Sequence, residues 1–484
     1  MRIKNFLFSV STIFVFVLSG CNNDRVDEPS YSFDQGLSDS ERINKFIVEG
    51  VRTCYLWESE TDWNQYYNRE TFAAYSDHYK LFDEFIHKDD HWSSLTNDID
   101  DLENQFGGIS TTFGYTLKFY YNPYTKNSEV VAIVLYTAPA SPAANAGLKR
   151  GDIIVEMNGG KITDVNYQSL YSAPSLTLQC GVPDAEAGVI SLVPGIKSLV
   201  AVQMYENPVN TTKIIEKSGH RVGYLCYTGY QMESEQELVR VFSDFKSAGV
   251  TDVVLDLRYN PGGYSRTARI LSSILAPASV VKTKSVYLEH YYNDLYTTYL
   301  KENNRELKET FIDTLSVNMN LDRLYILTSK NTASASEATM VGLEPYLDVI
   351  QIGDTTAGKY CGGILLSPED LDESHKDYYK NISNWGMYIM IYRYANVKGI
   401  TSFTSGLVPA KEMLAGEDYF DLKPFGDESD PLLGRALAHI LGKTYVEKRS
   451  EKIPLLLTSL PDKKRPIDGM LIAEPPFPVL VNPE

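Results

Sequence analysis

Apolar runs alternate with a helical pattern between residues 222 and 352, and this alternation limits the fold more than any other feature of the chain. Val222–Tyr227 and Val253–Leu257 are short apolar runs typical of buried strands. Between them, Glu235–Ala248 carries its apolar residues at the spacing of one helix face. Two more apolar runs follow at Leu324–Leu327 and Val349–Ile352. Strands that alternate with helices in this way predict an α/β core.

Loops rich in small residues follow the last two of these strands. The segment Thr332–Ala338 places Ser334 where a loop turns into a helix, and the segment Gly353–Lys359 places Lys359 directly after a glycine. A helix N-terminus supplies amide groups and a positive dipole, and a glycine lets the backbone approach another group closely. Lys359 lies 25 residues after Ser334. Ser334 is therefore a candidate nucleophile at a junction with open space for a substrate.

Three segments in a fixed order resemble the C-terminal processing peptidases, also called tail-specific proteases. They are Ser334-Ala335-Ser336-Glu337, the pattern Gly-Asp-x-Thr-x-Gly-Lys that ends at Lys359, and the strand that continues as Asp256-Leu257-Arg258-Tyr259-Asn260-Pro261-Gly262-Gly263. A PDZ-like segment lies upstream, as it does in the family. The resemblance covers most of residues 37–445. It implies a helical N-terminal domain at 37–108, a PDZ domain at 110–205 and a crotonase-like α/β spiral peptidase core at 208–445.

The resemblance also assigns a chemistry, in which Ser334 attacks a peptide carbonyl and Lys359 accepts its proton. A serine hydroxyl needs a base, and the sequence has neither a Gly-x-Ser-x-Gly elbow nor a triad-like motif around its seven histidines. A lysine is a base only when burial lowers its pKa from about 10.4, which the apolar and glycine-rich surroundings of Lys359 permit. The implied oxyanion donors are the N–H of Ala335 and one from Gly262 or Gly263. No cofactor or metal is implied.

Two departures from the family leave the group that orients Lys359 unassigned. Some members have an aspartate eleven residues after the serine, where this chain has Pro345, and others have a glutamine four residues after the lysine, where this chain has Gly363. The alternative function is therefore a catalytically inactive, peptide-binding lipoprotein that uses the PDZ groove alone. Retention of both Ser334 and Lys359 favours the serine endopeptidase.

Other polar residues of these motifs are interpreted as structural. Asp256 and Arg258 are expected to anchor their strand, and Ser336 and Glu337 are expected to begin a helix. His87 and His91 have the spacing of two helix-borne metal ligands, but the sequence shows no third ligand, so surface histidines are the better interpretation. Cys361, which lies two residues beyond Lys359, is interpreted as a small space-filling residue rather than a reactive thiol.

The predicted PDZ domain carries a recognisable peptide-binding loop. The segment Ser141–Asp152 closely resembles the family pattern Ser-Pro-Ala-x-x-Ala-Gly-Leu-x-x-Gly-Asp, with a short helix stopped by Gly147. The amides of the loop around Phe113-Gly114-Tyr115-Thr116-Leu117 would hold a peptide's terminal carboxylate, and the strand edge that follows would pair with the peptide. A rigid spacer that binds nothing is the alternative.

The N-terminal segment predicts a secreted protein with a lipid anchor. Residues 1–20 have a basic start and an apolar stretch, Phe6–Leu18, too short for a membrane helix of about 20 residues. Leu18-Ser19-Gly20-Cys21 resembles a bacterial lipobox, which implies a lipid anchor on Cys21 rather than an ordinary secretory signal. Residues 21–36 are interpreted as a flexible tether and 446–484 as an irregular tail. The expected location is the cell envelope, on the periplasmic face or the outer-membrane surface.

The negative net charge of the chain limits the classes of partner that it can bind. The formal net charge of −18 argues against nucleic acid and anionic lipid as ligands. We expect protein or peptide substrates, with the membrane contacted only through the N-terminal anchor. The five cysteines contain no CxxC pair, so the sequence does not predict a structural zinc site or a disulfide framework.

Overall fold

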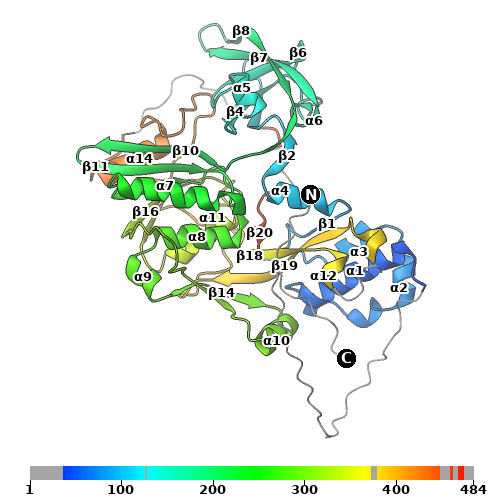
Figure 1. Ribbon diagram of the computed structural model, residues 1–484. Coiled ribbons are helices and arrows are strands. Elements are labelled where there is room, and N and C mark those ends of the chain that lie inside the picture. The colour runs from blue at the N-terminus through cyan, green and yellow to red at the C-terminus, as the bar shows by residue number, and fades with distance from the viewer. Residues whose placement is uncertain (1–35, 126–127, 372–378, 447–457, 462–466, 474–484) are drawn as a thin grey trace. The chain divides into compact units, whose positions relative to one another are not determined.

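The computed structural model describes residues 36–125, 128–371, 379–446, 458–461 and 467–473 (Figure 1). The chain divides into two units, Met1–Ser38 and Asp39–Glu484, and the elements below belong to the second. The predicted signal segment, Cys21 and almost the whole predicted tether lie outside the described residues. Within the described ranges, no helix is both long and apolar enough to cross a bilayer.

A five-stranded sheet forms the centre of the predicted catalytic region. Its order is β10 (Val209–Lys217), β11 (His220–Tyr227), β12 (Asp252–Asp256), β16 (Arg323–Thr328) and β17 (Asp348–Gly353). The last four strands pair in parallel, and β10 is antiparallel to β11. Parallel strands require long crossover connections, which the helices between them supply. The strands predicted from the four apolar runs, and the α/β class, are confirmed.

Helices cover both faces of this sheet, which explains why its strands read as continuous apolar runs. Leu225, Val253 and Leu324 belong to a core shared with residues of three helices on one face. Tyr224 and Val254 belong to the core that contains the helix on the other face. The three helices are α7 (Glu235–Ser247), α8 (Ser265–Leu275) and α11 (Ala335–Leu343), and the fourth is α14 (Pro431–Ile440) (Figure 1).

The carboxyl ends of the parallel strands bring the family motifs together. The loop Leu257–Gly262 follows β12, the segment that contains Ser334 follows β16, and the segment that contains Lys359 follows β17. Because β12, β16 and β17 are consecutive parallel neighbours, these three loops leave the sheet at the same edge.

A second, largely antiparallel sheet continues from these loops. Its order is β13 (Gly263–Tyr264), β20 (Leu471–Ile472), β18 (Cys361–Leu366), β19 (Gly386–Ala395), β14 (Val286–Tyr292) and β15 (Lys308–Thr310), with β1 (Ser94–Thr96) also paired to β19. The prediction of an irregular tail is wrong at β20, because this stretch pairs in parallel with β13 and β18. A two-residue strand has no periodicity that could reveal it in the sequence.

Further helices fill the predicted N-terminal region and the connections. Those before residue 108 are α1 (Asp39–Cys54), α2 (Arg69–Ala74), α3 (His78–Asp83) and α4 (Ile99–Phe106). The buried face of α1 includes Phe46, Ile47 and Val51 and belongs to the same core as the residues of β19. The connections contain α9 (Ala278–Lys282), α10 (Asp294–Glu302) and α12 (Pro368–Leu371).

A six-stranded sheet occupies the region predicted to be a PDZ domain. It consists of β3 (Tyr115–Tyr121), β4 (Val130–Thr137), β5 (Ile153–Met157), β6 (Gly160–Lys161), β7 (Ser175–Asp184) and β8 (Val189–Val200), with α5 (Pro142–Asn145) and α6 (Ser169–Ser172). The ribbon of β2 (Ile109–Thr112) and β9 (Val202–Tyr205) pairs the segments at its two ends. The PDZ assignment and the domain boundaries remain predictions.

Candidate active site

Ser334 stands immediately before α11 in a strained backbone conformation. Its φ angle is 63°, in the left-handed region that a non-glycine residue adopts at a cost of about 1–3 kcal/mol. The Ser334 carbonyl accepts a hydrogen bond from Ala338 N at 2.7 Å, so the residue already belongs to the first helical turn. Its Oγ is buried and has no hydrogen-bond partner within the part of the chain that the structure describes. The backbone therefore fixes the position of Ser334, and no hydrogen bond within the described residues occupies its hydroxyl.

Glu337 joins the serine segment to the lysine segment. Its carboxylate accepts hydrogen bonds from Ser334 N at 2.7 Å and Lys359 N at 2.9 Å, both on the same oxygen. The other oxygen accepts from Thr356 Oγ1 and Gly358 N, each at 2.6 Å. Burial raises the pKa of Glu337 to about 7, and the four donors oppose that shift by favouring the carboxylate. Sequence reasoning interpreted Glu337 as a helix-start residue and missed that it connects the two motifs.

Lys359 is fully buried beside two aromatic rings. Its Nζ lies 3.3 Å from Tyr388 Oη and 5.2 Å from the ring centres of both Trp92 and Tyr388. Burial lowers its pKa from 10.5 to about 7, although Cys361, Asp90 and Glu337 each act in the opposite direction. The expected lowering of its pKa is confirmed in direction. Gly358 has a φ of 91°, and a Cβ there would lie 2.5 Å from Thr404 O, so only glycine fits before the lysine.

One of the two predicted oxyanion glycines, Gly262, lies against the serine. A Cβ built on Gly262 would be 2.6 Å from Ser334 Cβ and 3.1 Å from Ala335 N. The structure therefore brings Gly262, Ser334 and Ala335 together. The N–H groups of the two glycines have internal partners, because Gly262 N donates to Asn260 Oδ1 at 2.9 Å and Gly263 N donates to Met470 O at 3.0 Å. Which glycine would be the second oxyanion donor remains a prediction.

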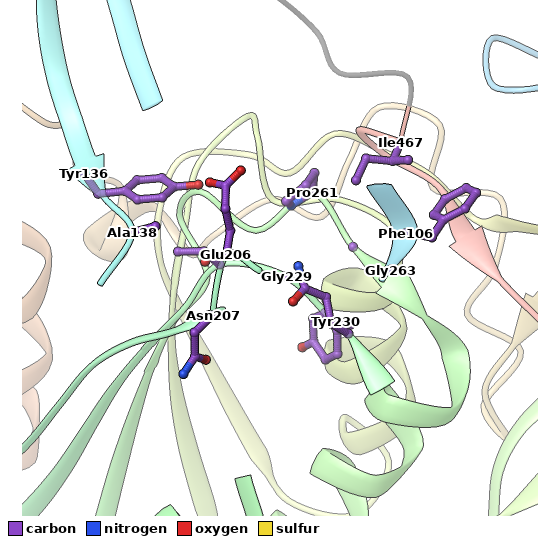
Figure 2. A pocket seen from close by; sticks show the side chains of 13 residues that line it. Phe106, Tyr136, Ala138, Glu206, Asn207, Gly229, Tyr230, Pro261, Gly263 and Ile467 are labelled. Carbon is purple, nitrogen blue, oxygen red and sulfur yellow. The ribbon is translucent and has the colours of Figure 1, made fainter. Parts of the chain in front are cut away.

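A small hollow lies directly beside these glycines (Figure 2). Figure 2 shows Pro261 and Gly263 at its border, with Tyr136, Glu206 and Tyr230 around it. Its lining combines aromatic and aliphatic side chains with polar ones, such as Glu206 and Gln231. Apart from the Pro261–Gly263 loop, no sequence motif pointed to this lining, because the residues come from six separate stretches. They are Phe106, Tyr136, Ala138, Glu206, Asn207, Thr228, Gly229, Tyr230, Gln231, Pro261, Gly262, Gly263 and Ile467.

The interpretation of Asp256 and Arg258 as structural residues agrees with their contacts. The buried Arg258 guanidinium forms ion pairs with Asp256 at 2.9 Å, with Asp430 at 2.8 Å and with Glu417 at 2.8 Å. Asn260 Nδ2 donates to Tyr227 O at 3.0 Å. These bonds fix the loop that carries Gly262.

The predicted PDZ loop lies at the start of β3. Gly114 has a φ of 72°, and a Cβ there would collide with Ser141 Cβ at 2.2 Å, so the loop requires glycine. The side chains of Phe113, Tyr115 and Leu117 are buried in the core of the six-stranded sheet. Gly114 N donates to Thr112 Oγ1 at 2.9 Å, and Leu117 N donates to Tyr171 Oη at 2.8 Å.

The remaining candidates occupy ordinary structural positions. His87 stacks on Trp57, and their ring centres are 5.0 Å apart. The described part of the chain contains no group of three or more histidine, cysteine, aspartate and glutamate side chains that could hold a metal. Cys361 is a buried free thiol whose pKa is raised to about 12 by burial, as suits a space-filling residue.

Comparison with known proteins agrees with these motifs. Residues 221–409 match peptidase family S41. The chain contains a peptidase family S41 domain. This domain includes the whole of both site segments and the Gly262–Gly263 loop, and the predicted resemblance is confirmed at this level.

Individual relatives are distant. The carboxy-terminal processing protease CtpB of Bacillus subtilis is 24% identical over 267 residues, which are 54% of this chain and 48% of that protein, so the chain spans about half of its length. A carboxyl-terminal-processing protease of Synechocystis is 22% identical over 366 residues, 73% of this chain and 76% of the relative. A solved structure from Bacteroides fragilis, described as an S41 protease, is 26% identical, has a TM-score of 0.67 and covers 82% of this chain and 97% of its own.

Proposed function

We propose that this protein is a serine endopeptidase of the C-terminal processing type, with Ser334 as nucleophile and Lys359 as general base. The observation that carries the proposal is the Glu337 carboxylate, which accepts from the backbone N–H groups of both residues on one oxygen. A free, buried Ser334 hydroxyl and a lysine whose pKa burial lowers to about 7 supply the two groups that such a reaction needs.

The chemistry follows from these groups. Neutral Lys359 accepts the Ser334 proton while Ser334 Oγ bonds to the scissile carbonyl carbon. The carbonyl oxygen becomes an oxyanion beside Ala335 N, at the start of α11, where the helix dipole favours negative charge. The resulting lysine ammonium gives its proton to the leaving amine, and the acyl-enzyme remains. Water then attacks the ester, again with Lys359 as base, and releases the second product.

Labelling of the serine tests this assignment. A fluorophosphonate probe should label wild-type protein and leave Ser334→Ala unlabelled, and a peptide library varied at its C-terminus should be cleaved only by wild type. A folded wild-type protein that neither reacts with the probe nor cleaves any peptide would overturn the proposal in favour of the non-catalytic peptide-binding lipoprotein.

We also propose that the 110–205 region recognises the free C-terminus of a substrate. The glycine-dependent loop at Gly114 and the Ser141–Asp152 pattern support this. Amidation of the terminal carboxylate should weaken peptide binding by at least tenfold. Equal binding of the acid and amide forms would leave this region as a spacer.

The envelope location is a further proposal, which rests on the Leu18–Cys21 lipobox. Lipidation of Cys21 would tether the protein to a membrane through its acyl chains, because several chains anchor stably where one is marginal. Cys21→Ser should move the protein from the membrane fraction to the soluble fraction. Membrane fractionation that is unchanged in this variant would rule out the anchor.

A further inference from the structure

The lysine at the site has a neighbour that no motif assigned. Tyr388 lies on β19, which neighbours the strand that follows Lys359. Its hydroxyl is 3.3 Å from Lys359 Nζ, and the same hydroxyl donates to Leu471 O at 2.7 Å. A phenol has one proton. Because the Leu471 carbonyl takes that proton, the Tyr388 oxygen faces Lys359 only as an acceptor.

Gly363, on the neighbouring strand β18, leaves space for the Tyr388 ring. A Cβ built on Gly363 would lie 2.4 Å from Ile389 O and 2.8 Å from Tyr388 Cζ. A side chain at 363 and the Tyr388 ring cannot occupy this space together. The Ile389 carbonyl by itself already excludes a side chain at 363, and the glycine leaves room for the Tyr388 ring.

We propose that Tyr388 is the positioning residue for Lys359, held in its acceptor orientation by the C-terminal strand β20. The proposal rests on the function proposed above for Lys359. The aromatic rings of Trp92 and Tyr388 confine the ammonium, and the hydroxyl fixes its direction. The ionisable groups that face Lys359 from other elements are Asp90, Glu337 and Cys361, and a change at Tyr388 leaves all three in place.

The test is Tyr388→Phe, with Tyr392→Phe as the matched control, because both tyrosines are fully buried on β19. An acceptor hydroxyl favours the charged lysine, so its loss should lower the Lys359 pKa. We expect kcat to fall 10- to 100-fold, KM to change less than threefold, and the acidic limb of the pH–rate profile to move to lower pH. Tyr392→Phe should leave that limb unchanged.

The outcomes separate this inference from the proposed function. Wild-type protein without probe labelling or cleavage contradicts the function itself. An active wild type together with a Tyr388→Phe variant of unchanged kcat and pH midpoint overturns only the role of Tyr388. A shift of the limb that Tyr392→Phe reproduces would also overturn it. Rates are expressed per folded molecule at each pH, so partial unfolding does not obscure the result.

An independent observation concerns the strand edge predicted to bind peptides. The chain's own segment Thr458–Leu460 lies along β3 in antiparallel register, with Ser459 opposite Tyr120. Tyr121 N donates to Thr458 O at 3.0 Å, and Leu460 N donates to Phe119 O at 3.1 Å. Leu460 is 6% exposed and belongs to the core of the six-stranded sheet. This is the geometry of strand addition to a sheet edge.

We propose that this edge is a binding site for an extended peptide with an aliphatic side chain, and that Thr458–Leu460 is its resident occupant. An external peptide would have to replace the two hydrogen bonds and the buried Leu460. The edge is also closed nearer the loop, because the Tyr171 hydroxyl accepts from Leu117 N. This proposal rests on the recognition function proposed for this region. It adds that Thr458–Leu460 competes with a substrate for the edge of β3.

Binding of a fluorescein-labelled peptide with the sequence of residues 455–461 tests this. The full chain with Leu460→Asp, which expels the buried leucine, should bind the peptide at least tenfold more tightly than wild type, and Leu460→Ala should lie between them. Ser459→Ala is the control, because Ser459 is exposed. Hydrogen exchange at the Tyr121 amide should be faster in Leu460→Asp and slow again when the peptide is added. Equal affinity of wild type and Leu460→Asp, or fast exchange that the peptide does not slow, would overturn the proposal.

Discussion

At the scale of single residues, Lys359 is a group that the fold maintains at a cost. Because burial lowers its pKa from 10.5 to about 7, the unfolded chain binds more protons than the folded chain between these pH values. The stability of the protein should therefore rise with pH across this window as far as this group is concerned. Below pH 7 the full penalty applies, on the order of 5 kcal/mol.

Lys359→Met should remove that penalty. We expect the free energy of unfolding in urea to increase at pH 7, and the difference from wild type to shrink between pH 7 and pH 10. Lys330→Met is a suitable control, because the Lys330 side chain is 80% exposed. A variant that is less stable than wild type at pH 7, or a difference that does not change with pH, would contradict the buried, neutral lysine.

The same residue predicts the pH dependence of activity. If Lys359 must be neutral, kcat should rise with pH through an ionisation near 7 and then level off. Lys359→Arg should be nearly inactive, because a guanidinium stays charged and cannot accept a proton. The double variant Ser334→Ala with Lys359→Ala should be no less active than either single variant, since the two residues act as one unit. Cleavage by Lys359→Arg at near the wild-type rate would identify another base.

At the scale of elements, Glu337 holds α11 and the loop after β17 to one another. Glu337→Gln would turn an amide N–H₂ toward backbone N–H donors and leave at least one of them buried and unpaired, at a cost of about 1–3 kcal/mol. We expect a lower unfolding midpoint and little labelling of Ser334 by a fluorophosphonate. Glu344→Gln, at the other end of α11, should change neither. Because Glu337 and Lys359 both have pKa values of about 7, the acidic limb of the activity profile belongs to the pair.

The elements also show what could be read from the sequence. The strands at 222–227 and 253–257 and the helix after Ser334 were predicted because periodicity and small-residue loops are local signals. Tyr388 and the segment Thr458–Leu460 were missed because their contacts are long-range and their own sequences carry no motif. Tyr388 lies within β19, an almost continuously buried strand, and only the pairing of β19 with β18 brings it to Lys359. The sequence shows a glycine at 363 where some family members have a glutamine. Only the fold shows that Tyr388 lies beside this glycine and contacts Lys359.

At the scale of the whole second unit, a buried ion network connects the six-stranded sheet to the parallel sheet. Glu417 accepts from Arg150, which follows α5, from Arg258 at 2.8 Å and from Tyr259 Oη at 2.6 Å. Arg150 also donates to Leu135 O at 2.7 Å and to Lys423 O at 2.8 Å. Burial raises the pKa of Glu417, but the two arginines outweigh it and hold that pKa below its usual range. The Glu417 carboxylate therefore offsets the repulsion between the buried guanidinium groups of Arg150 and Arg258.

Glu417→Gln should break this connection. It leaves Arg150 and Arg258 close together with one negative charge fewer, and loss of one partner in a buried network costs about 3–5 kcal/mol. Because the pKa of Glu417 is lowered in the folded state, its stabilisation of the fold is fully present above the unfolded pKa of about 4.5 and is lost as the pH falls below it. The loss of stability in Glu417→Gln should therefore be largest at neutral pH. We expect calorimetry at pH 7 to show a lower midpoint and an early transition for the six-stranded sheet, which should merge with the main one in wild type. Glu412→Gln, on the same segment but exposed, should unfold like wild type. A single unshifted transition in Glu417→Gln would show that the two sheets are held together by apolar contacts alone, such as those of Tyr136 and Tyr259 with Phe425.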